Sequence, residues 1–531
     1  MSHTADIVVA GAGHNSLITA AYLQKAGFSC VVLDTRRVPG GASTTEEFLL
    51  PGFRIDGCST GHTLIQSNPV IADDELGLIA DYGLRYIDPD PVYHVGLPDG
   101  EAVTLWLDLD RTCEEIARFS RADADAYRRL IAEYDEVKHI FAQTRGPIGS
   151  GPALEALLDA HPRGRIWMRR NAMSAWEVIR REFEDPHVQA FLLWVAIQTL
   201  APTDMPGSGL LPYSLTFARQ RRSWTIPVGG SGQLTDALVR YIEDRGGSVR
   251  CGENVTRLLI EGGRCVGVET AAGEHYLARK AVVSTIHVEH LIDMAPAEAW
   301  GEEFIYGVET YDIGGSVFTS YYASTEPPIF ETSQGPTSSV ACGVAEWPEE
   351  MIRLERDIRD GKWVRAPWIL CASPSAVDPW RTPEGKHWFK ILAEQVPEPP
   401  AGRTWDGVKP ELAAEHLARI RRVAPNLTDD VILASLAKSP LDLEADNPHM
   451  IRGAMHGGSR SPAFSGANRP VPGWASHRMP IPGLYQTGAT THPGGSVTGF
   501  PGRNAAIVML QDFGIDPAEA MAREPATAAV K

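Results

Sequence analysis

The sequence has few cysteines, and their spacing predicts neither a disulfide framework nor a metal site. Seven cysteines in 531 residues lie between Cys30 and Cys371, and no two form a C-x-x-C pair. No set of His, Cys and Asp residues has metal-ligand spacing, and the G-x-S-x-G pattern of hydrolases is missing. We therefore expect no bound metal, and a reducing cytoplasm is the simplest location.

Long apolar stretches are missing as well. The longest run, residues 191–201, is interrupted by Gln198 and has about half the length that a membrane span needs. Residues 1–5 carry no basic segment, and a short apolar run then leads directly into a glycine turn, which does not fit a secretory signal. The sequence thus gives no strong membrane signal.

Basic residues are also fewer than acidic residues. The chain has 49 Lys and Arg against 67 Asp and Glu residues, a net charge of −18 at pH 7. Binding to nucleic acid or to anionic lipid depends largely on basic residues that neutralise phosphate. We therefore expect no nucleic-acid partner.

What is present indicates a large α/β protein. A chain of 531 residues is expected to form more than one structural unit. Strand-like and helix-like segments alternate at both ends, in residues 6–33 and 483–510, and residues 248–285 look like a run of strands. Residues 111–141 and 153–200 have helical spacing, whereas 313–344 and 363–395 are more strand-like.

A glycine-rich turn follows the first predicted strand and opens a helix. It consists of Gly11, Ala12, Gly13, His14, Asn15 and Ser16, and Asp34 ends the next strand about twenty residues later. In such a turn the glycines allow backbone to approach a pyrophosphate, the helix N-terminus offers free N–H groups, and the acid binds ribose hydroxyls. Ser16 stands where glycine or alanine is usual, and we expect its hydroxyl to reach a phosphate oxygen. The alternative is an ordinary strand–turn–helix with accidental glycines.

Two further segments favour FAD over a nicotinamide cofactor. A second glycine turn, residues 36–44, follows Asp34 at once, where its backbone can wrap the far side of an extended dinucleotide. A glycine-rich loop, residues 488–499, precedes a helix near the C-terminus. Because Pro501 fits only a first helical turn, we expect this helix to begin within residues 497–500, with its N-terminus toward the cofactor's negative charge.

These segments resemble the phytoene desaturase-like branch of the flavin amine oxidase superfamily, in particular its pyridine nucleotide-disulphide oxidoreductase domain-containing proteins. Four blocks carry the resemblance, and they lie in family order: residues 9–34, 39–46, 224–238 and 480–506. The resemblance implies a discontinuous FAD-binding domain of glutathione-reductase type and an inserted α+β substrate domain with a mixed sheet and a helical cap. We assign residues 1–70, 220–295 and 476–520 to the first domain and residues 71–219 and 296–475 to the second.

The resemblance also implies that Val255 contacts adenine through its backbone and that residues 494–498 lie against the isoalloxazine. Besides the first glycine turn and Asp34, the expected FAD-binding residues are Thr35, Arg36, Gly41, Ala42, Ser43, Val255, Gly488, Gly495, Ser496 and Val497. The last cysteine is Cys371, so the C-terminal flavin segment offers no thiol for a covalent tether. We expect non-covalent FAD.

Three histidines are candidate catalytic residues. His492 lies in the flavin loop and resembles the Thr-His-Pro-Gly segment of carotenoid desaturases, His456 lies on a glycine-flanked loop, and His62 follows a segment expected to pass the cofactor. A histidine near its ordinary pKa can act as a general base. The alternative for each is a hydrogen-bonded structural imidazole. Trp224 and Tyr213 either wall an apolar cavity or belong to the core.

The leading hypothesis is an FAD-dependent dehydrogenase or oxidase that passes a hydride from a largely apolar small molecule to flavin N5. Such an enzyme would introduce C=C, C=N or C=O unsaturation. A redox-neutral isomerase or saturase of the same fold is the alternative, and a flavin-binding protein without catalysis is a third interpretation. The expected partner is a small-molecule substrate, and a second copy of the chain stays open.

Overall fold

The glycine turn near the N-terminus lies in the βαβ unit that the sequence predicts. In the computed structural model, which describes residues 2–522, strand β1 (Ser2–Ala10) leads into helix α1 (His14–Lys25). Strand β2 (Cys30–Asp34) then returns parallel to β1, with Val8 opposite Val31. Neighbouring β1 residues pack into different hydrophobic clusters, Val9 with α1 and Val8 on the other face. Both faces are covered, which explains the continuous apolar run.

The other strands of this first sheet come from the middle and the end of the chain. The strand order is β10-β11-β12-β1-β2-β9, and β20 pairs with β12. The pairings that involve β1, β2, β9 and β20 are parallel, whereas β10, β11 and the start of β12 form an antiparallel ribbon. The bounds are β9 Ser248–Cys251, β10 Val255–Glu261, β11 Arg264–Thr270, β12 His275–Ser284 and β20 Leu484–Gln486. The expected discontinuous domain is confirmed.

Helices cover both faces of the first sheet. Helix α1 packs with α10 (Gly232–Asp244) and α17 (Phe500–Asp512) on one face. Residues of α11 (Val288–Leu291), α12 (Ala297–Trp300) and α13 (Glu302–Glu309) pack against the other.

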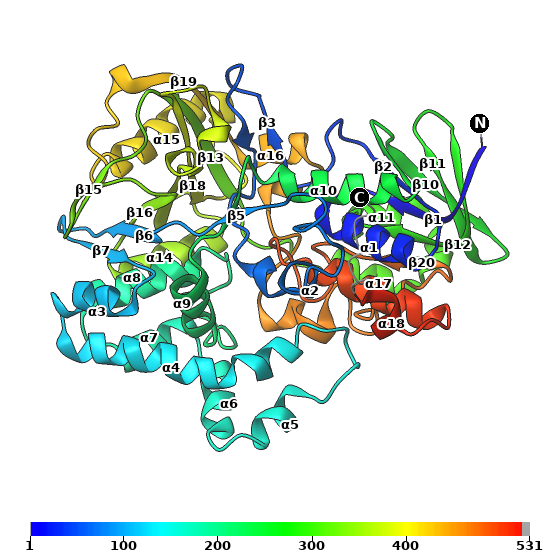
Figure 1. Ribbon diagram of the computed structural model, residues 1–531, viewed down its shortest axis with the longest axis horizontal. Coiled ribbons are helices and arrows are strands. Elements are labelled where there is room, and N and C mark those ends of the chain that lie inside the picture. The colour runs from blue at the N-terminus through cyan, green and yellow to red at the C-terminus, as the bar shows by residue number, and fades with distance from the viewer. Residues whose placement is uncertain (1, 523–531) are drawn as a thin grey trace, which may run out of the picture.

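A second sheet forms the other lobe of the molecule, on the left in Figure 1. Its strand order is β19-β13-β18-β17-β16-β6-β7, and it is mixed, because β16 runs parallel to β6 while the other neighbours are antiparallel. Its strands are β6 Tyr93–Gly96, β7 Ala102–Leu105, β13 Val317–Ser324, β16 Ala341–Ala345, β17 Trp368–Ala372, β18 His387–Glu394 and β19 Ile432–Lys438. The mixed sheet that the resemblance implies is therefore present.

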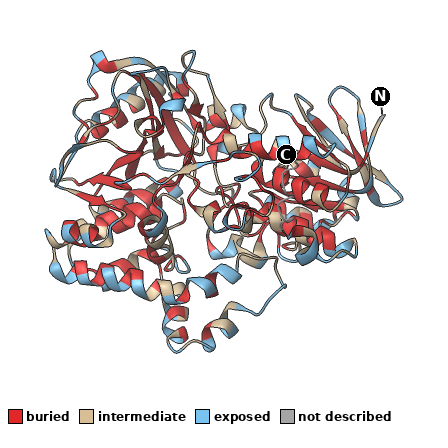
Figure 2. Ribbon diagram, viewed as in Figure 1, coloured by how far each residue is buried: buried red, intermediate tan, exposed pale blue. Residues whose placement is uncertain are grey.

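A group of helices lies below the second sheet in Figure 1 and forms the helical cap. It comprises α3 Leu109–Ala117, α4 Arg121–Gln143, α5 Leu154–Asp159, α6 Gly164–Ala172, α7 Ala175–Glu182, α8 Pro186–Ile197 and α9 Leu211–Arg222. Side chains cap the N-termini of several of these helices. At α4 the Ser120 hydroxyl accepts a hydrogen bond from the Asp123 N–H, and at α7 Ser174 forms a capping box with Glu177. Figure 2 shows the helices nearest the sheet mostly in red, whereas the outermost helices of the group carry much pale blue.

The longest apolar run of the sequence lies mostly in α8, which is buried almost entirely in the lobe's core. No helix in residues 2–522 combines the length and the apolar character that a membrane span requires.

Residues 2–522 also contain six further strands and five further α-helices. They are β3 Thr45–Glu46, β4 Ile55–Asp56, β5 Tyr86–Ile87, β8 Ile226–Pro227, β14 Phe330–Thr332, β15 Gly335–Thr337, α2 Pro69–Ala72, α14 Pro348–Arg359, α15 Trp405–Ile420, α16 Pro440–Asp446 and α18 Pro517–Met521.

The predicted domain segments follow the two sheets, although packing crosses their limits. Segments 1–70, 220–295 and 476–520 contain every strand of the first sheet, and 71–219 and 296–475 contain every strand of the second. Trp300 and Phe304, which lie beyond residue 295, nevertheless pack against the first sheet. The exact residues at which the chain passes between lobes stay a prediction.

Four buried charges join the lobes. Arg381 donates to Asp56 of β4 at 2.6 Å and to Asp378 at 2.8 Å, and all three side chains are fully buried. Lys390 of β18 donates to the backbone carbonyls of Asp56, at 3.1 Å, and of Cys58. Two acids and two bases balance, so this cluster has no net charge.

Candidate active site

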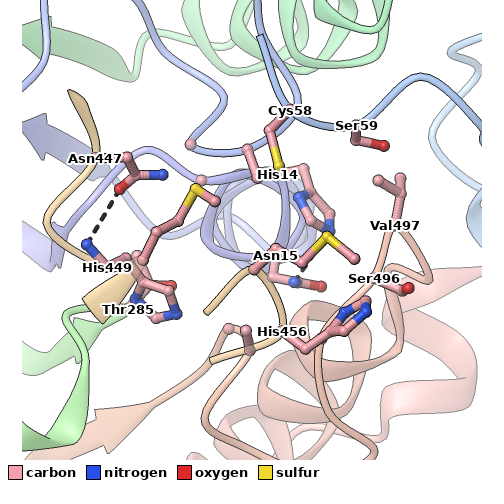
Figure 3. Close-up of a pocket in the computed structure, with 18 of the residues that line it drawn as sticks. His14, Asn15, Cys58, Ser59, Thr285, Asn447, His449, His456, Ser496 and Val497 are labelled. Atoms are coloured by element: carbon pink, nitrogen blue, oxygen red, sulfur yellow. Dashed lines mark hydrogen bonds between the residues drawn. The ribbon is translucent and has the colours of Figure 1, made fainter. Parts of the chain in front are cut away.

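A cavity of about 690 Å³ lies where the two lobes meet. One end is formed by the loops that leave the first sheet, and the other by β17, β18 and the cap helices α8 and α9. Figure 3 shows side chains from distant parts of the chain, among them His14, Cys58, His456 and Ser496, around this space.

Most of the predicted FAD-binding residues line this one cavity. The cavity-lining members are Gly11, Gly13, His14, Asn15, Asp34, Thr35, Arg36, Gly41, Ala42, Val255, Gly488, Gly495, Ser496 and Val497. Ala12, Ser16 and Ser43 are buried just behind the lining. The fold thus brings together segments that are more than 400 residues apart in the sequence.

The two glycines of the first turn have different tasks. Gly11 has φ +102°, and a Cβ there would lie 2.3 Å from Thr285 Cγ2, so the turn itself requires glycine. Gly13 has an ordinary φ of −67°, and a Cβ there would meet no atom within 4 Å. The space beside Gly13 is therefore open to the cavity, as a cradle for a pyrophosphate requires.

Asp34 is held at the end of β2 by two backbone groups. Its Oδ2 accepts from the Ala12 N–H at 2.6 Å and its Oδ1 from the Arg36 N–H at 2.8 Å. Burial raises the pKa of Asp34, and these two bonds oppose the rise. A carboxylate has about four acceptor positions, so capacity for ribose hydroxyls remains.

The hydroxyl of Ser16 does not have the role that the sequence suggested. It donates to the carbonyls of Gly11, at 2.6 Å, and Gly13, at 2.9 Å, and so braces the turn from behind. The prediction that it reaches a phosphate oxygen is not supported. The Oγ atom of Ser43, another predicted FAD-binding residue, lies 3.4 Å from the Nδ1 atom of His14.

The C-terminal flavin helix begins at Phe500, within the predicted range, and Pro501 occupies its first turn. Its N-terminus reaches the cavity indirectly, because Asn15, which lines the cavity, accepts from the Gly502 N–H at 3.3 Å. Just before the helix, Ser496 lines the cavity with φ +85°, a strained conformation for a residue other than glycine. Such strain is concentrated at ligand sites.

Of the three candidate catalytic histidines, only His456 lines the cavity. Neither of its ring nitrogens has a hydrogen-bond partner among residues 2–522. Burial holds the pKa of His456 well below its usual value, so the ring is neutral at pH 7.

The other two candidates are bound elsewhere. The Nε2 atom of His492 lies 2.9 Å from the carbonyl oxygen of Thr144. The Nε2 atom of His62 lies 2.7 Å from the Oγ atom of Ser231. Neither lines the cavity. Burial lowers the pKa of both, that of His62 to about 3. The expectation that these imidazoles contact flavin or substrate is not supported by their positions, which fit the structural alternative.

Sequence reasoning missed other imidazoles of the cavity. His287 and His449 line it with ring centroids 5.2 Å apart, and the Nε2 atom of each lacks a partner in the described chain. Burial lowers the pKa of His449 to about 4, as it does for His14. These histidines stand outside any motif, so only the fold reveals them.

The substrate half of the cavity is mainly apolar. Its aromatic and aliphatic lining consists of Leu64, Tyr93, Val195, Leu215, Trp224, Trp368, Leu370, Ala372, Leu392, Met450 and Met455. Trp224 therefore walls the cavity, as one of the two expectations had it, whereas Tyr213 belongs to the core of the cap. Lys390, Arg219 and Gln198 are polar exceptions that the sequence did not single out.

Cys58 is the only cysteine of the described chain that lines the cavity. Burial raises the pKa of its thiol, which keeps it protonated and unreactive at neutral pH. Non-covalent attachment of FAD stays a prediction. No group of three or more metal-binding side chains occurs in residues 2–522.

The flavin containing amine oxidoreductase family model matches residues 17–304. The chain belongs to this family. It is an FAD-dependent oxidoreductase, and the open cradle beside Gly13 fits the cofactor.

Full-length relatives agree with this assignment. A limonene dehydrogenase polypeptide of Castellaniella defragrans is 29% identical and is matched over 96% of this chain and 95% of its own length. Pyridine nucleotide-disulfide oxidoreductase domain-containing protein 2 of Mus musculus is 28% identical, and the match covers 96% of this chain and 94% of that protein. A lycopene-forming phytoene desaturase of Paracoccus sp. is 25% identical, and the match covers 95% of this chain and 97% of that protein. This match confirms the phytoene desaturase-like resemblance.

Two further comparisons bear on chemistry and fold. Prolycopene isomerase 1 of an Oncidium hybrid cultivar is 24% identical over 96% of this chain and 84% of its own length. The crystal structure of an oxidoreductase from Methanosarcina mazei matches 97% of this chain and 100% of its own, with TM-score 0.62 and 16% identity.

Proposed function

We propose that this oxidoreductase takes a hydride from a largely apolar small molecule, whose adjacent C–H, N–H or O–H group loses a proton to solvent, so that a new C=C, C=N or C=O bond remains in the product. The observation that carries the proposal is the composition of the cavity, with dinucleotide-binding loops at one end and aromatic and aliphatic walls at the other. Two relatives are named for limonene and phytoene, and these names support an apolar substrate.

Bound FAD supplies a hydride acceptor at N5. The chain's own residues exclude water and orient the substrate. Leu370, Leu392 and Trp368 present apolar surface from the second sheet, which favours a substrate that gives up little hydration on entry.

His456 is the group that we expect to orient the reacting bond. Its ring is neutral at pH 7, and both nitrogens are free of protein partners in the described chain. One nitrogen can accept a hydrogen bond from a substrate O–H or N–H while the other donates. Its low pKa makes His456 a weak proton acceptor. We therefore expect it to orient the substrate by hydrogen bonding and not to act as the general base.

A redox-neutral isomerisation is the second candidate, and one relative favours it. Prolycopene isomerase 1 matches 96% of this chain, so the same fold carries that chemistry under a related sequence. Both candidates use the cavity in the same way and differ in whether the flavin keeps the electrons.

Anaerobic mixing tests the proposal. Purified protein is expected to be yellow and to release FAD, not FMN, on heat denaturation. The holoenzyme would then be mixed with cyclic terpenes, longer polyenes and apolar amines and alcohols, and the flavin absorbance followed.

Lasting bleaching with formation of an unsaturated product is the expected result. Product without lasting bleaching would favour isomerisation instead. A protein that cannot be reconstituted with FAD would contradict both candidates.

A further inference from the structure

Arg219 is a cation in the apolar half of the cavity without a counter-charge. It extends from α9 and donates to the Thr63 hydroxyl. Its guanidinium carbon lies 5.6 Å from the ring centre of Tyr93 and 5.3 Å from that of Trp224, and all three residues line the cavity. No acidic residue of the described chain forms an ion pair with it.

Lys390, the other cation of this half, differs in this respect. Its charge belongs to the balanced cluster with Asp56, Asp378 and Arg381. The acidic residues that line the cavity are Asp34, Glu253 and Asp293, which lie on or beside the first sheet, away from the cap helices. The surplus charge at the substrate end is therefore that of Arg219.

A second donor converges on the same place. Gln198, just after α8, accepts from the Tyr93 hydroxyl at 3.4 Å through Oε1, while its buried Nε2 has no partner among residues 2–522. Leaving a buried donor unpaired is unfavourable, so such a group is expected to meet a ligand or an ordered water. Arg219 of α9 and Gln198 at the C-terminal end of α8 thus both lie near the Tyr93 side chain, and all three residues line the cavity.

We propose that the substrate is an amphiphile with an apolar body and a carboxylate head, and that Arg219, assisted by Gln198 Nε2, binds this head. The inference rests on the proposed function and adds a substrate class to it. A guanidinium forms charge-assisted hydrogen bonds with carboxylates. A pure hydrocarbon would leave the Arg219 charge uncompensated inside an apolar cavity.

The test uses the FAD-loaded protein and two matched series of probes. Straight-chain carboxylates from butanoate to decanoate, and the corresponding primary amides, are titrated while the flavin difference spectrum is followed at pH 7.5. For the chain length that fits best, we expect the carboxylate to bind about 10- to 100-fold more tightly than its amide.

Arg219→Gln is expected to remove this preference, Arg219→Lys to keep part of it, and Gln198→Leu to weaken carboxylate binding severalfold. Arg222→Gln is the matched control, because Arg222 is an exposed arginine of the same helix that does not line the cavity, and its preference should equal that of the wild type. If Arg219→Gln does not retain FAD, the inference is tested by the two other variants. A carboxylate preference that is unchanged in both Arg219→Lys and Gln198→Leu would then contradict it.

Equal binding of acid and amide across the wild-type series would overturn the inference, as would a preference that survives in Arg219→Gln. Such a result would leave the proposed function standing, because the readout is ligand binding to a flavin-loaded protein. Failure of the proposed function would appear separately, as loss of FAD binding or as lack of flavin reduction.

Discussion

Gly13 is a position where a side chain would enter the cofactor space without straining the backbone. Its φ of −67° suits any residue, and a Cβ would meet open space. Gly13→Val is therefore expected to fold but to lose FAD, with at least a 100-fold fall in affinity, because the branched side chain fills the cradle. The ratio of flavin to protein absorbance and a far-UV circular dichroism spectrum check this. Gly13→Ala should show a smaller loss, and tight FAD binding by the valine variant would place the cradle elsewhere.

His456 and His492 form a natural pair for a test of catalytic contact. His456 lines the cavity with free nitrogens, whereas His492 is bound to the Thr144 carbonyl outside the lining. We expect His456→Ala to slow flavin reduction by substrate about 10²-fold, in the range of positioned polar groups. His492→Ala should stay within a few-fold. Rapid-mixing absorbance measurements on yellow, folded variants give both rates, and the reverse order would restore His492 as the catalytic candidate.

The sequence predicted residues well where a motif fixes backbone and poorly where side-chain direction matters. Gly11, Gly13 and Asp34 lie as expected, since a βαβ unit with a glycine turn has one geometry. Position along a loop does not tell which way a ring points, and so the sequence did not show that the rings of His492 and His62 lie outside the cavity lining. Arg219 and His449 belong to no motif and reach the cavity only through tertiary packing.

At the scale of elements, helices α1 and α17 cross very closely. A Cβ on Gly502 would lie 2.3 Å from the Asn15 carbonyl oxygen, and the Thr19 hydroxyl donates to the Gly502 carbonyl at 2.9 Å. The sequence could not reveal this contact, because a glycine inside a helix looks only like a poor helix former. The crossing holds Asn15 between the flavin helix and the cavity.

Gly502→Ala is therefore expected to destabilise the protein, although alanine favours a helix by about 1 kcal/mol. The clash is with backbone and cannot be relieved by a rotamer change, so we expect a net loss of about 1–3 kcal/mol and weaker FAD retention. Thermal melting with and without added FAD measures this. Gln511→Ala, at an exposed position of the same helix, is the control and should change stability by less than about 0.5 kcal/mol. A more stable Gly502→Ala protein would show that the helices can separate.

At the scale of the whole molecule, burial of charge is the feature that the sequence left most obscure. Composition gives a net charge of −18 but does not say which charges the fold encloses. The structure buries a balanced cluster around Arg381 between the lobes and two acids, Glu355 and Glu394, inside the second lobe. The α/β architecture followed from strand and helix periodicity, whereas these enclosed charges depend on contacts between segments far apart in the chain.

Glu394 and Glu355 make stability depend on pH in a defined direction. Burial, followed by the charge of Glu355, raises the pKa of Glu394 to about 8, and burial raises that of Glu355 to about 7. A carboxyl group whose pKa is raised on folding favours the folded state most below its unfolded pKa of about 4.3, and this advantage is lost as pH rises through the folded pKa. We therefore expect the melting temperature to fall between about pH 5 and pH 8, as both groups are forced to ionise in the core.

Glu394→Gln should remove much of that fall, because an amide of the same shape stays neutral at every pH. The variant is expected to match the wild type at pH 5 and to exceed its stability at pH 8.5 by about 2 kcal/mol or more, since each pKa unit corresponds to about 1.4 kcal/mol. Melting curves from pH 5 to pH 9 measure the difference. Glu349→Gln, at an exposed position near the start of α14, is the control and should follow the wild-type curve. Parallel curves for wild type and Glu394→Gln would show that Glu394 is already ionised in the folded protein and that water or a nearby cation stabilises its charge.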